Sequence, residues 1–391
     1  MLRTNKRYSR SILTTNGWLA IERYVLRPKE KADASRLMDL EGVKTVVPLD
    51  DHLQLTGLPF KMTPEVMLNV AYWAQSQGSY QEAEDAILRA YKVKINDDTI
   101  RQVANYVGSM IHQNDCREAE SVYGMLNKGK LKFPNKKRKG ILYIEADGAS
   151  LNTRSKSSDG STWRENKLGI VFSSDNIYNW VDHKGKPQRQ INKREYTSYV
   201  GSVSEFKKHL LACALRNGYG EYEKTVLIGD GAVWIRNMRD ELFPDAQQIL
   251  DFYHLCENVN TYAKAIFGND PSRYSPWSNE ICSLLKESKW KEALVLVGKQ
   301  KKPQDCAVDL QGYITGNAHC IDYASYIEKD YFIGSGAIES GNKSVLQQRL
   351  KQAGMRWNVQ TAQCLLSLRA KYKSGLWVQC VEKPILELLQ K

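Results

Sequence analysis

The 391-residue chain carries 56 Lys and Arg against 44 Asp and Glu, a formal net charge of +12, and has a mean hydropathy of −0.51. This length predicts two or three domains, and no apolar stretch approaches the ~20 residues that a membrane-spanning helix needs. The positive charge favours a polyanionic partner, and the eight cysteines contain no Cys-x-x-Cys pair, which excludes a zinc ribbon.

The cysteines and the N-terminal residues both indicate an intracellular protein. The cysteines are irregularly spaced, which is typical of free thiols in a reducing compartment. The basic residues Arg3, Lys6 and Arg7 are not followed by the apolar core of a signal peptide. We therefore expect a soluble protein that stays inside the cell.

Residues 1–62 predict a region of strands and loops. Residues 8–26 are strand-like and contain Asn16-Gly17, a pair that favours the tight turn of a hairpin. The sequence therefore predicts a β-hairpin that turns at these two residues.

Residues 63–127 predict a helical domain. Thr63 can cap a first helix, a second helix should span residues 80–90, and a third should begin near Asn96. A short helix, a turn and a longer helix are compatible with a helix-turn-helix DNA reader. An ordinary three-helix bundle fits the same pattern equally well.

Strand and helix signals then follow in the order β-β-β-α-β-α-β-α. That order predicts an α/β, ribonuclease-H-like (retroviral-integrase-like) fold, which is a mixed sheet with helices on both faces. The core should comprise residues 141–264 and 331–375, with a helical insertion at 265–330 and a tail at 376–391. Strands are predicted at residues 141–147, 168–172, 196–200, 225–229 and 248–252, and helices at 202–216, 232–241 and from 253.

Three acidic residues are the main candidates for chemistry. Asp147 and Asp230 each end an apolar strand and precede a glycine, and Glu339 lies where a helix begins. Two divalent ions roughly 4 Å apart can activate a nucleophile and stabilise a leaving oxygen in phosphoryl transfer. Mg²⁺ or Mn²⁺ prefers hard carboxylate oxygens, so these three residues predict a two-metal site.

Each acid also has a structural explanation when it is taken alone. A strand that ends in Asp-Gly is commonly a turn, and a glutamate at a helix start is favoured by the helix dipole. The three residues together, in this order and on these elements, favour the catalytic interpretation.

A second motif follows the fifth predicted strand. Asp251 and His254 are three residues apart at the junction between this strand and the next helix. His254 could bind a scissile phosphate or orient a catalytic group. The alternative is an aspartate that caps the helix and a histidine that packs, and the spacing alone favours that alternative.

Two stretches that border the acids, residues 121–144 and 340–381, contain no acidic residue. The first includes the predicted basic linker at residues 128–140. Both stretches are compatible with solvated surfaces, although their position beside the acids favours contact with nucleic-acid phosphates. The predicted DNA-contacting residues are Lys136, Lys137, Arg138, Lys343, Arg349, Lys351, Arg356 and Trp357.

These motifs together resemble a known family. The resemblance rests on Gly334-Ser-Gly-Ala-Ile-Glu-Ser-Gly-Asn-Lys343, on residues 350–357, on Ile228-Gly-Asp-Gly-Ala232 and on Asp251-x-x-His254. The chain resembles bacterial insertion-sequence transposases of the ISLre-type group, which have a DDE catalytic core and are related to Mutator-like transposases. The resemblance implies that Asp147, Asp230 and Glu339 are the metal-binding triad, with Asp251 and His254 as accessory catalytic residues.

The resemblance also implies partners and a location. Such enzymes cut the ends of a mobile element and join the free 3′ hydroxyls to target DNA, so double-stranded DNA is the expected substrate. Two ends must be held together, which implies a homodimer or a larger assembly, with two Mg²⁺ or Mn²⁺ ions in each active site. The bacterial cytoplasm, in association with the nucleoid, is the expected location.

Three functions remain open from the sequence. The chain is a transposase, or a nuclease of the same fold that cuts without joining, or a DNA-binding regulator without catalysis. Trp277 and Trp290 in the insertion either belong to its core or stack on a displaced base.

Overall fold

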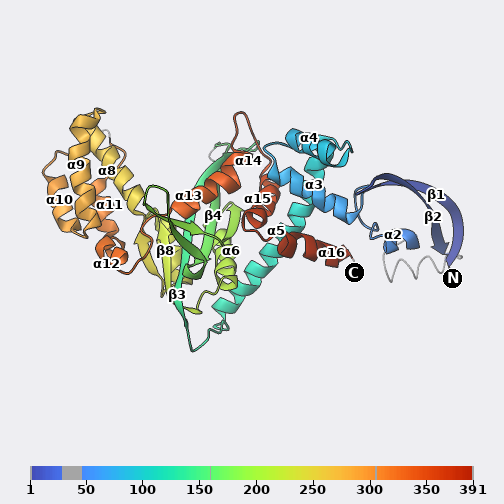
Figure 1. Ribbon diagram of the computed structural model, residues 1–391, viewed down its shortest axis with the longest axis horizontal. Helices are drawn as coiled ribbons and strands as arrows, with labels where there is room; N and C mark the ends of the chain where they lie inside the picture. Colours follow the sequence, from blue (N-terminus) through green and yellow to red (C-terminus); the bar gives the residue numbers. More distant parts are fainter. Residues whose placement is uncertain (1, 29–45, 159, 304–305, 390–391) are drawn as a thin grey trace. The chain divides into compact units, whose positions relative to one another are not determined.

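The computed structural model describes residues 2–28, 46–158, 160–303 and 306–389 (Figure 1). The chain forms two compact units. The first combines Met1–Gln113 with Gln360–Tyr372 and Leu376–Lys391, and the second combines Asn114–Val359 with Lys373–Gly375. No helix among the described residues is long and apolar enough to cross a membrane.

The first unit begins with the predicted hairpin. Strands β1 (Leu2–Thr14) and β2 (Gly17–Pro28) pair in antiparallel register, with Thr14 opposite Gly17. Gly17 has a φ of +104°, a conformation that glycine adopts without the steric cost of a side chain. The predicted turn at Asn16-Gly17 is therefore confirmed. Part of the expected strand and loop region, residues 29–45, lies outside the described residues.

Four helices follow, and the last of them continues into the second unit. They are α2 (Pro48–His52), α3 (Pro64–Ser76), α4 (Tyr80–Tyr91) and α5 (Asp97–Asn127). Ser79 caps α4 because its hydroxyl accepts the Glu82 backbone N–H at 3.0 Å. Thr63 is the N-cap residue of α3, as predicted, but its side chain makes no capping hydrogen bond.

The end of the chain contributes to the same core. Helix α15 (Val359–Lys373), the π-helical turn η4 (Val378–Glu382) and α16 (Lys383–Leu389) bring Leu368, Val381 and Ile385 against the apolar faces of α3 to α5. Residues 376–389, expected to belong to a tail, are helical and partly buried. Burial of their apolar side chains stabilises this packing.

A five-stranded mixed sheet forms the centre of the second unit. Its strands lie in the order β7 (Glu195–Val200), β4 (Trp163–Ser173), β3 (Arg138–Asn152), β8 (Tyr222–Gly229) and β9 (Gln247–Leu250). β3 pairs antiparallel with β4 and parallel with β8, so the first strand of the sheet lies at its centre. All five predicted strands are present, although β3 starts three residues earlier and ends five residues later than expected. Asp147 therefore lies within β3 and not at its end, which corrects the expected position.

Helices pack against this sheet. α6 (Val203–Arg216) and α7 (Val233–Leu242) bury Phe206, Leu210 and Ile235 with the apolar side chains of the strands. α8 (Phe252–Phe267) follows β9. The mixed α/β architecture is therefore confirmed.

One hairpin was not predicted. β5 (Ile177–Val181) and β6 (Pro187–Ile191) pair antiparallel after the short 3-10 helix η1 (Ser174–Asn176). Most of its side chains are exposed, so it lacks the alternating buried pattern from which strands are recognised. Asp182 holds the turn by accepting the backbone N–H groups of Lys184 and Lys186.

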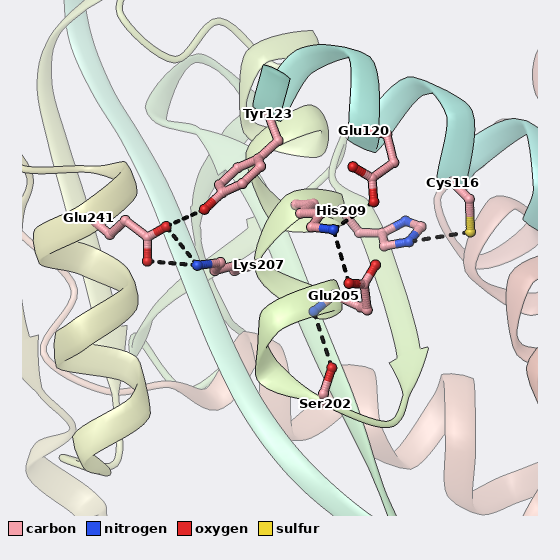
Figure 2. A network of polar contacts seen from close by, with 9 residues as sticks. Cys116, Glu120, Tyr123, Ser202, Glu205, Lys207, His209 and Glu241 are labelled. Atoms are coloured by element: carbon pink, nitrogen blue, oxygen red, sulfur yellow. Dashed lines mark hydrogen bonds and ion pairs between the residues drawn. The ribbon is translucent and has the colours of Figure 1, made fainter. Parts of the chain in front are cut away.

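The C-terminal half of α5 is tied to α6 and α7 by charged side chains (Figure 2). Glu241 accepts hydrogen bonds from Lys207 Nζ at 2.6 Å and from Tyr123 Oη at 2.6 Å. Lys208 Nζ donates to Glu120 at 2.5 Å and to Glu205 at 2.9 Å. Each carboxylate in this network therefore has a cationic partner.

The predicted insertion is helical in its described residues. It contains α9 (Pro271–Lys286), α10 (Trp290–Gly298), α11 (Leu310–Gly316), the 3-10 turn η2 (Ala318–Cys320) and α12 (Tyr323–Glu328). Trp277 stacks on Tyr262 of α8, with 6.3 Å between the ring centroids, and contacts Phe267. These contacts assign Trp277 a packing role.

The segment that carries Glu339 follows the insertion. It consists of α13 (Gly336–Gly341), a π-helical stretch η3 (Asn342–Gln347) and α14 (Gln348–Leu350). α14 and α15 are separated by a break at Gly354, which has a φ of +78°, a conformation that glycine adopts without the steric cost of a side chain.

Candidate functional site

Asp147 and Asp230 extend from two neighbouring parallel strands at the centre of the sheet. The last pair in the register of β3 and β8 joins Glu145 and Ile228, and each aspartate lies two residues further along its strand direction. Both side chains are half-buried. Burial raises the pKa of Asp147, and the nearby charge of Asp230 raises it further.

Hydrogen bonds orient both aspartates. Asp147 accepts the backbone N–H of Gly148 at 2.7 Å and the side-chain amide of Asn342 at 2.6 Å. Asp230 Oδ1 accepts the Ala232 N–H at 3.0 Å, and its backbone carbonyl accepts the Tyr313 hydroxyl. The Asp147 carboxyl is therefore held by its own strand and by Asn342, and the Asp230 carboxyl is held by the backbone of its own loop.

Asn342 is a site residue that sequence reasoning missed. It is 3 % exposed, and its Oδ1 is buried without a hydrogen-bond partner among the described residues. It lies three residues after Glu339, a spacing that places two side chains on the same side of a helix. That spacing, inside a motif already singled out, was the available signal.

Glu339 lies on α13 and is exposed. Partial burial raises the pKa of its carboxyl, and the negative charges of Asp251, Glu257 and Asp147 raise it further. Glu339 is therefore within electrostatic reach of Asp147. Within the described residues, however, no three His, Cys, Asp or Glu side chains are grouped closely enough to hold one metal ion.

Asp251 is a capping residue of α8. It is buried, and its Oδ1 accepts the backbone N–H of Tyr253 at 2.7 Å and of His254 at 3.3 Å. Its Oδ2 accepts both the N–H and the hydroxyl of Ser335. These bonds fix the segment before α13 and agree with the capping alternative, and a catalytic role for Asp251 stays a prediction.

His254 lies near enough to Asp147 and Glu339 to affect the pKa of both carboxyls. Its side chain is half-buried, and Nδ1 lies 3.6 Å from Glu257 Oε2. A positive charge on its ring would lower the pKa of both Asp147 and Glu339. A role for His254 in the chemistry stays a prediction.

Glu145 is a second residue that sequence reasoning missed. It lies two residues before Asp147 on β3, so both side chains point to the same face of the sheet. It is 1 % exposed, and burial raises its pKa to about 8. Its Oε2 accepts the backbone N–H of Ile338 at 2.8 Å, which links the central strand to the helix that carries Glu339.

A cleft of about 850 Å³ opens beside these residues within the second unit. Its lining includes Glu145 and Glu339, β6, the start of α8 and residues 330–337. The cleft therefore adjoins the candidate acids on the side of Glu339.

The predicted DNA-contacting residues divide into two groups. Six of them are exposed, namely Lys136, Lys137, Arg138, Lys343, Lys351 and Arg356. Arg349 and Trp357 are buried, at 1 % and 8 % exposure, and the Arg349 guanidinium lies 5.4 Å from the Trp357 ring centroid. Trp357 also donates its indole N–H to the Leu350 carbonyl at 2.9 Å. The structure therefore assigns these two residues to packing and corrects their expected contact with DNA.

Comparison with known proteins identifies the family of this chain. No curated protein matches the sequence significantly. A family model with the description "Uncharacterised protein family (UPF0236)" matches residues 38–384, a range that contains Asp147, Asp230 and Glu339. Since the match covers most of the chain, the protein belongs to this family.

Proposed function

We propose that this protein is a DNA transposase of the ISLre type, which cuts at the ends of an insertion element and joins them to target DNA. One observation carries the proposal. Asp147 and Asp230 extend from adjacent parallel strands at the centre of a mixed sheet, and Glu339 lies near enough to Asp147 for the negative charge of Asp147 to raise the pKa of Glu339. Acids whose pKa is raised by burial and by neighbouring negative charge are typical of catalytic sites.

The strand order supports a ribonuclease-H-like core. Numbered along the chain, the five strands lie in the order 3-2-1-4-5, and the second strand is antiparallel to its neighbours. This arrangement agrees with the fold expected from the element order. Asp147 then lies on strand one and Asp230 directly follows strand four, and that fold would hold catalytic carboxylates on these two strands.

The residues fit a divalent cation chemically. The donors are hard carboxylate oxygens, and the amide Oδ1 of Asn342, buried without a partner among the described residues, is a further oxygen donor near Asp147. In this proposal Asp147, Asp230 and Glu339 would hold two Mg²⁺ or Mn²⁺ ions. When bound, the ions would activate the attacking oxygen and stabilise the leaving oxygen.

The surrounding residues would keep the acids in place. Asn342 orients the Asp147 carboxyl through its amide N–H. Glu145 fixes the start of α13 through the Ile338 N–H, and Asp251 fixes the preceding residue Ser335. Two independent anchors on one short helix would hold Glu339 near Asp147 while DNA binds.

Exposed basic side chains would hold the DNA. Lys136 and Lys137 lie before β3, and Lys343, Lys351 and Arg356 lie after Glu339. Neutralising phosphates there would make binding fall steeply as salt concentration rises. Because two element ends must be joined, the active form would be a homodimer or a larger assembly.

The decisive experiment uses a supercoiled plasmid that carries the native flanks of the gene. Purified protein is incubated with Mg²⁺ or Mn²⁺, and the 3′ ends and joined products are mapped. We expect metal-dependent breaks at the element ends, followed by joining, and loss of both in Asp230→Asn. Asp240→Asn, an exposed aspartate on α7, is the matched control and should keep both activities.

Other outcomes would identify the alternatives. Breaks without joining would indicate a nuclease of the same fold. Tight binding to the element ends without breaks, unchanged in Asp230→Asn, would indicate a DNA-binding regulator.

A further inference from the structure

The cleft beside Glu339 has the size of a ligand-binding site. Its volume of about 850 Å³ lies within the range of roughly 300–1,000 Å³ that is usual for small-molecule pockets. Glu145 lies on one side, β6 contributes Arg189, and Tyr253 at the start of α8 contributes an aromatic ring. None of the functions assigned to the acids requires a cleft of this size.

Aromatic rings line the cleft, and one of them is presented to solvent. Tyr253 is 61 % exposed although it belongs to the wall. Its ring packs edge-on against Phe252, and the absence of a side chain at Gly334 leaves room for it. A tyrosine ring that is fixed on one side and open on the other can stack on a flat ligand.

Arg194 supplies a fixed donor in the same cleft. Its Nε donates to the Tyr196 hydroxyl at 3.0 Å, and its Nη1 donates to the Ile191 carbonyl at 2.7 Å. These bonds hold the guanidinium and leave Nη2 without a hydrogen-bond acceptor in the described part of the chain. Arg189 is already paired with Asp330, so it adds little free positive charge.

The charge of the cleft argues against a phosphate as the ligand. Its lining contains two arginines and four acidic residues, namely Glu145, Glu257, Asp330 and Glu339. The rest of the chain is strongly basic, so phosphates have better sites on the exposed lysines. Carboxyl and guanidinium groups beside an aromatic ring instead match the hydrogen-bonding edges and the flat face of a nucleobase.

We propose that the cleft receives an unpaired nucleobase of the DNA next to the phosphate that is cut, with Tyr253 stacking on the base and Arg194 donating to its edge. The inference rests on the proposed function, because Glu339 is both a wall of the cleft and a member of the acidic set. It adds that the substrate must be locally unpaired at the cutting site.

The test compares two DNA probes with the full-length protein in EDTA, which prevents cleavage. One probe is a blunt duplex, and the other is the same duplex with a single-stranded 3′ overhang that carries 2-aminopurine. We expect the overhang to bind about tenfold more tightly, the scale of one stacked base, and its fluorescence to change on binding. Tyr253→Ala should remove the preference, and Tyr253→Phe should retain it.

Tyr178→Ala is the matched control, because Tyr178 is 57 % exposed in the same unit but does not line the cleft. It should leave the preference unchanged. Equal preference in wild type and Tyr253→Ala would overturn the inference.

The plasmid assay separates this result from failure of the proposed function. Metal-dependent breaks at the element ends without any preference for the overhang would refute the proposal that the cleft binds a base. The proposal that the protein is a transposase would still hold. If the protein binds neither probe and makes no breaks, both proposals are refuted.

Discussion

Carboxylates in two parts of the second unit have opposite surroundings. In the network between α5, α6 and α7, hydrogen bonds from Lys207 and Tyr123 outweigh the effect of burial and lower the pKa of Glu241 (Figure 2). In the part of the sheet where β3 and β8 lie side by side, burial and the negative charge of Asp230 raise the pKa of Asp147. No Lys or Arg forms an ion pair with Asp147, Asp230 or Glu339 in the described ranges of the chain.

The difference separates acids that stabilise the fold from acids that cost stability. A paired carboxylate on a helix surface contributes modestly to stability. Half-buried carboxylates that repel one another lower the stability of the folded state. Groups that are kept in a protein although they lower its stability are typical of functional sites. The missing positive charge is what a divalent cation would supply.

The largest expected effect comes from removing one of the unpaired acids. Asp147→Asn, Asp230→Asn and Glu339→Gln should each reduce DNA cleavage by at least about a hundredfold, the scale of losing one group that stabilises transition-state charge. DNA binding should change little, because the phosphate contacts lie on the lysines. Cleavage is measured on the flanking plasmid and binding by a gel shift. If a variant still cleaves DNA, the residue that it replaces is not a member of the triad.

Metal binding should stabilise the protein through the same acids. An ion at about 100 times its Kd adds about 2.7 kcal/mol to the free energy of unfolding. We expect Mg²⁺ or Mn²⁺ to raise the melting temperature of the wild type and not that of Asp147→Asn, as measured by scanning fluorimetry. Glu241→Gln removes a paired acid and should keep the metal-dependent shift. An equal shift in all three proteins would place the ions elsewhere.

The link between β3 and α13 should show an intermediate effect. Glu145→Leu leaves the buried Ile338 N–H without an acceptor, a loss of about 1–3 kcal/mol, and it should also reduce cleavage because Glu339 loses an anchor. Glu145→Gln retains an acceptor at the same place and should restore most of both properties. Chemical denaturation and the cleavage assay measure the two effects. Equal behaviour of the two variants would show that this hydrogen bond does not position Glu339.

The smallest expected effect lies in the paired network. Lys207→Met should cost about 0.2–1 kcal/mol of stability and leave cleavage unchanged. Because the pKa of Glu241 is lowered in the folded state, its stabilisation is present above the unfolded value of about 4.3 and is lost as the pH falls through the folded value. Wild type should therefore lose more stability than Lys207→Met on acidification below this pH. Parallel curves of unfolding free energy against pH would refute the role of this pair.

Local patterns in the sequence were sufficient for much of the fold. The Asn16-Gly17 turn, the start of α4 after Ser79 and the five strands of the sheet follow from turn residues, helix caps and apolar runs. The acids Asp147 and Asp230, which have no cationic partner in the described residues, were also recognised, because each ends an apolar run in the sequence. These signals depend on neighbours within a few residues, so they survive without knowledge of the tertiary structure.

Other features depend on contacts between distant residues. Glu145 resembles an ordinary strand residue until the helix that begins 191 residues later supplies the Ile338 N–H. Arg349 and Trp357 are residue types that commonly contact DNA, but in the folded protein both are buried by packing. The β5–β6 hairpin was missed for a different reason. Most of its side chains are exposed, so its sequence lacks the alternation of apolar and polar residues that marks a strand with one buried face.

The sequence by itself determined the order of the elements, the basic character of the chain and the identity of the three acids, since caps, turns and charge are local properties. Only the tertiary structure decided which acids are left without a cationic partner, that Asn342 and Glu145 support them, and that a cleft lies beside Glu339. The physical reason is that burial and hydrogen bonding set the pKa and the position of a carboxyl, and both depend on segments nearly 200 residues apart in the chain.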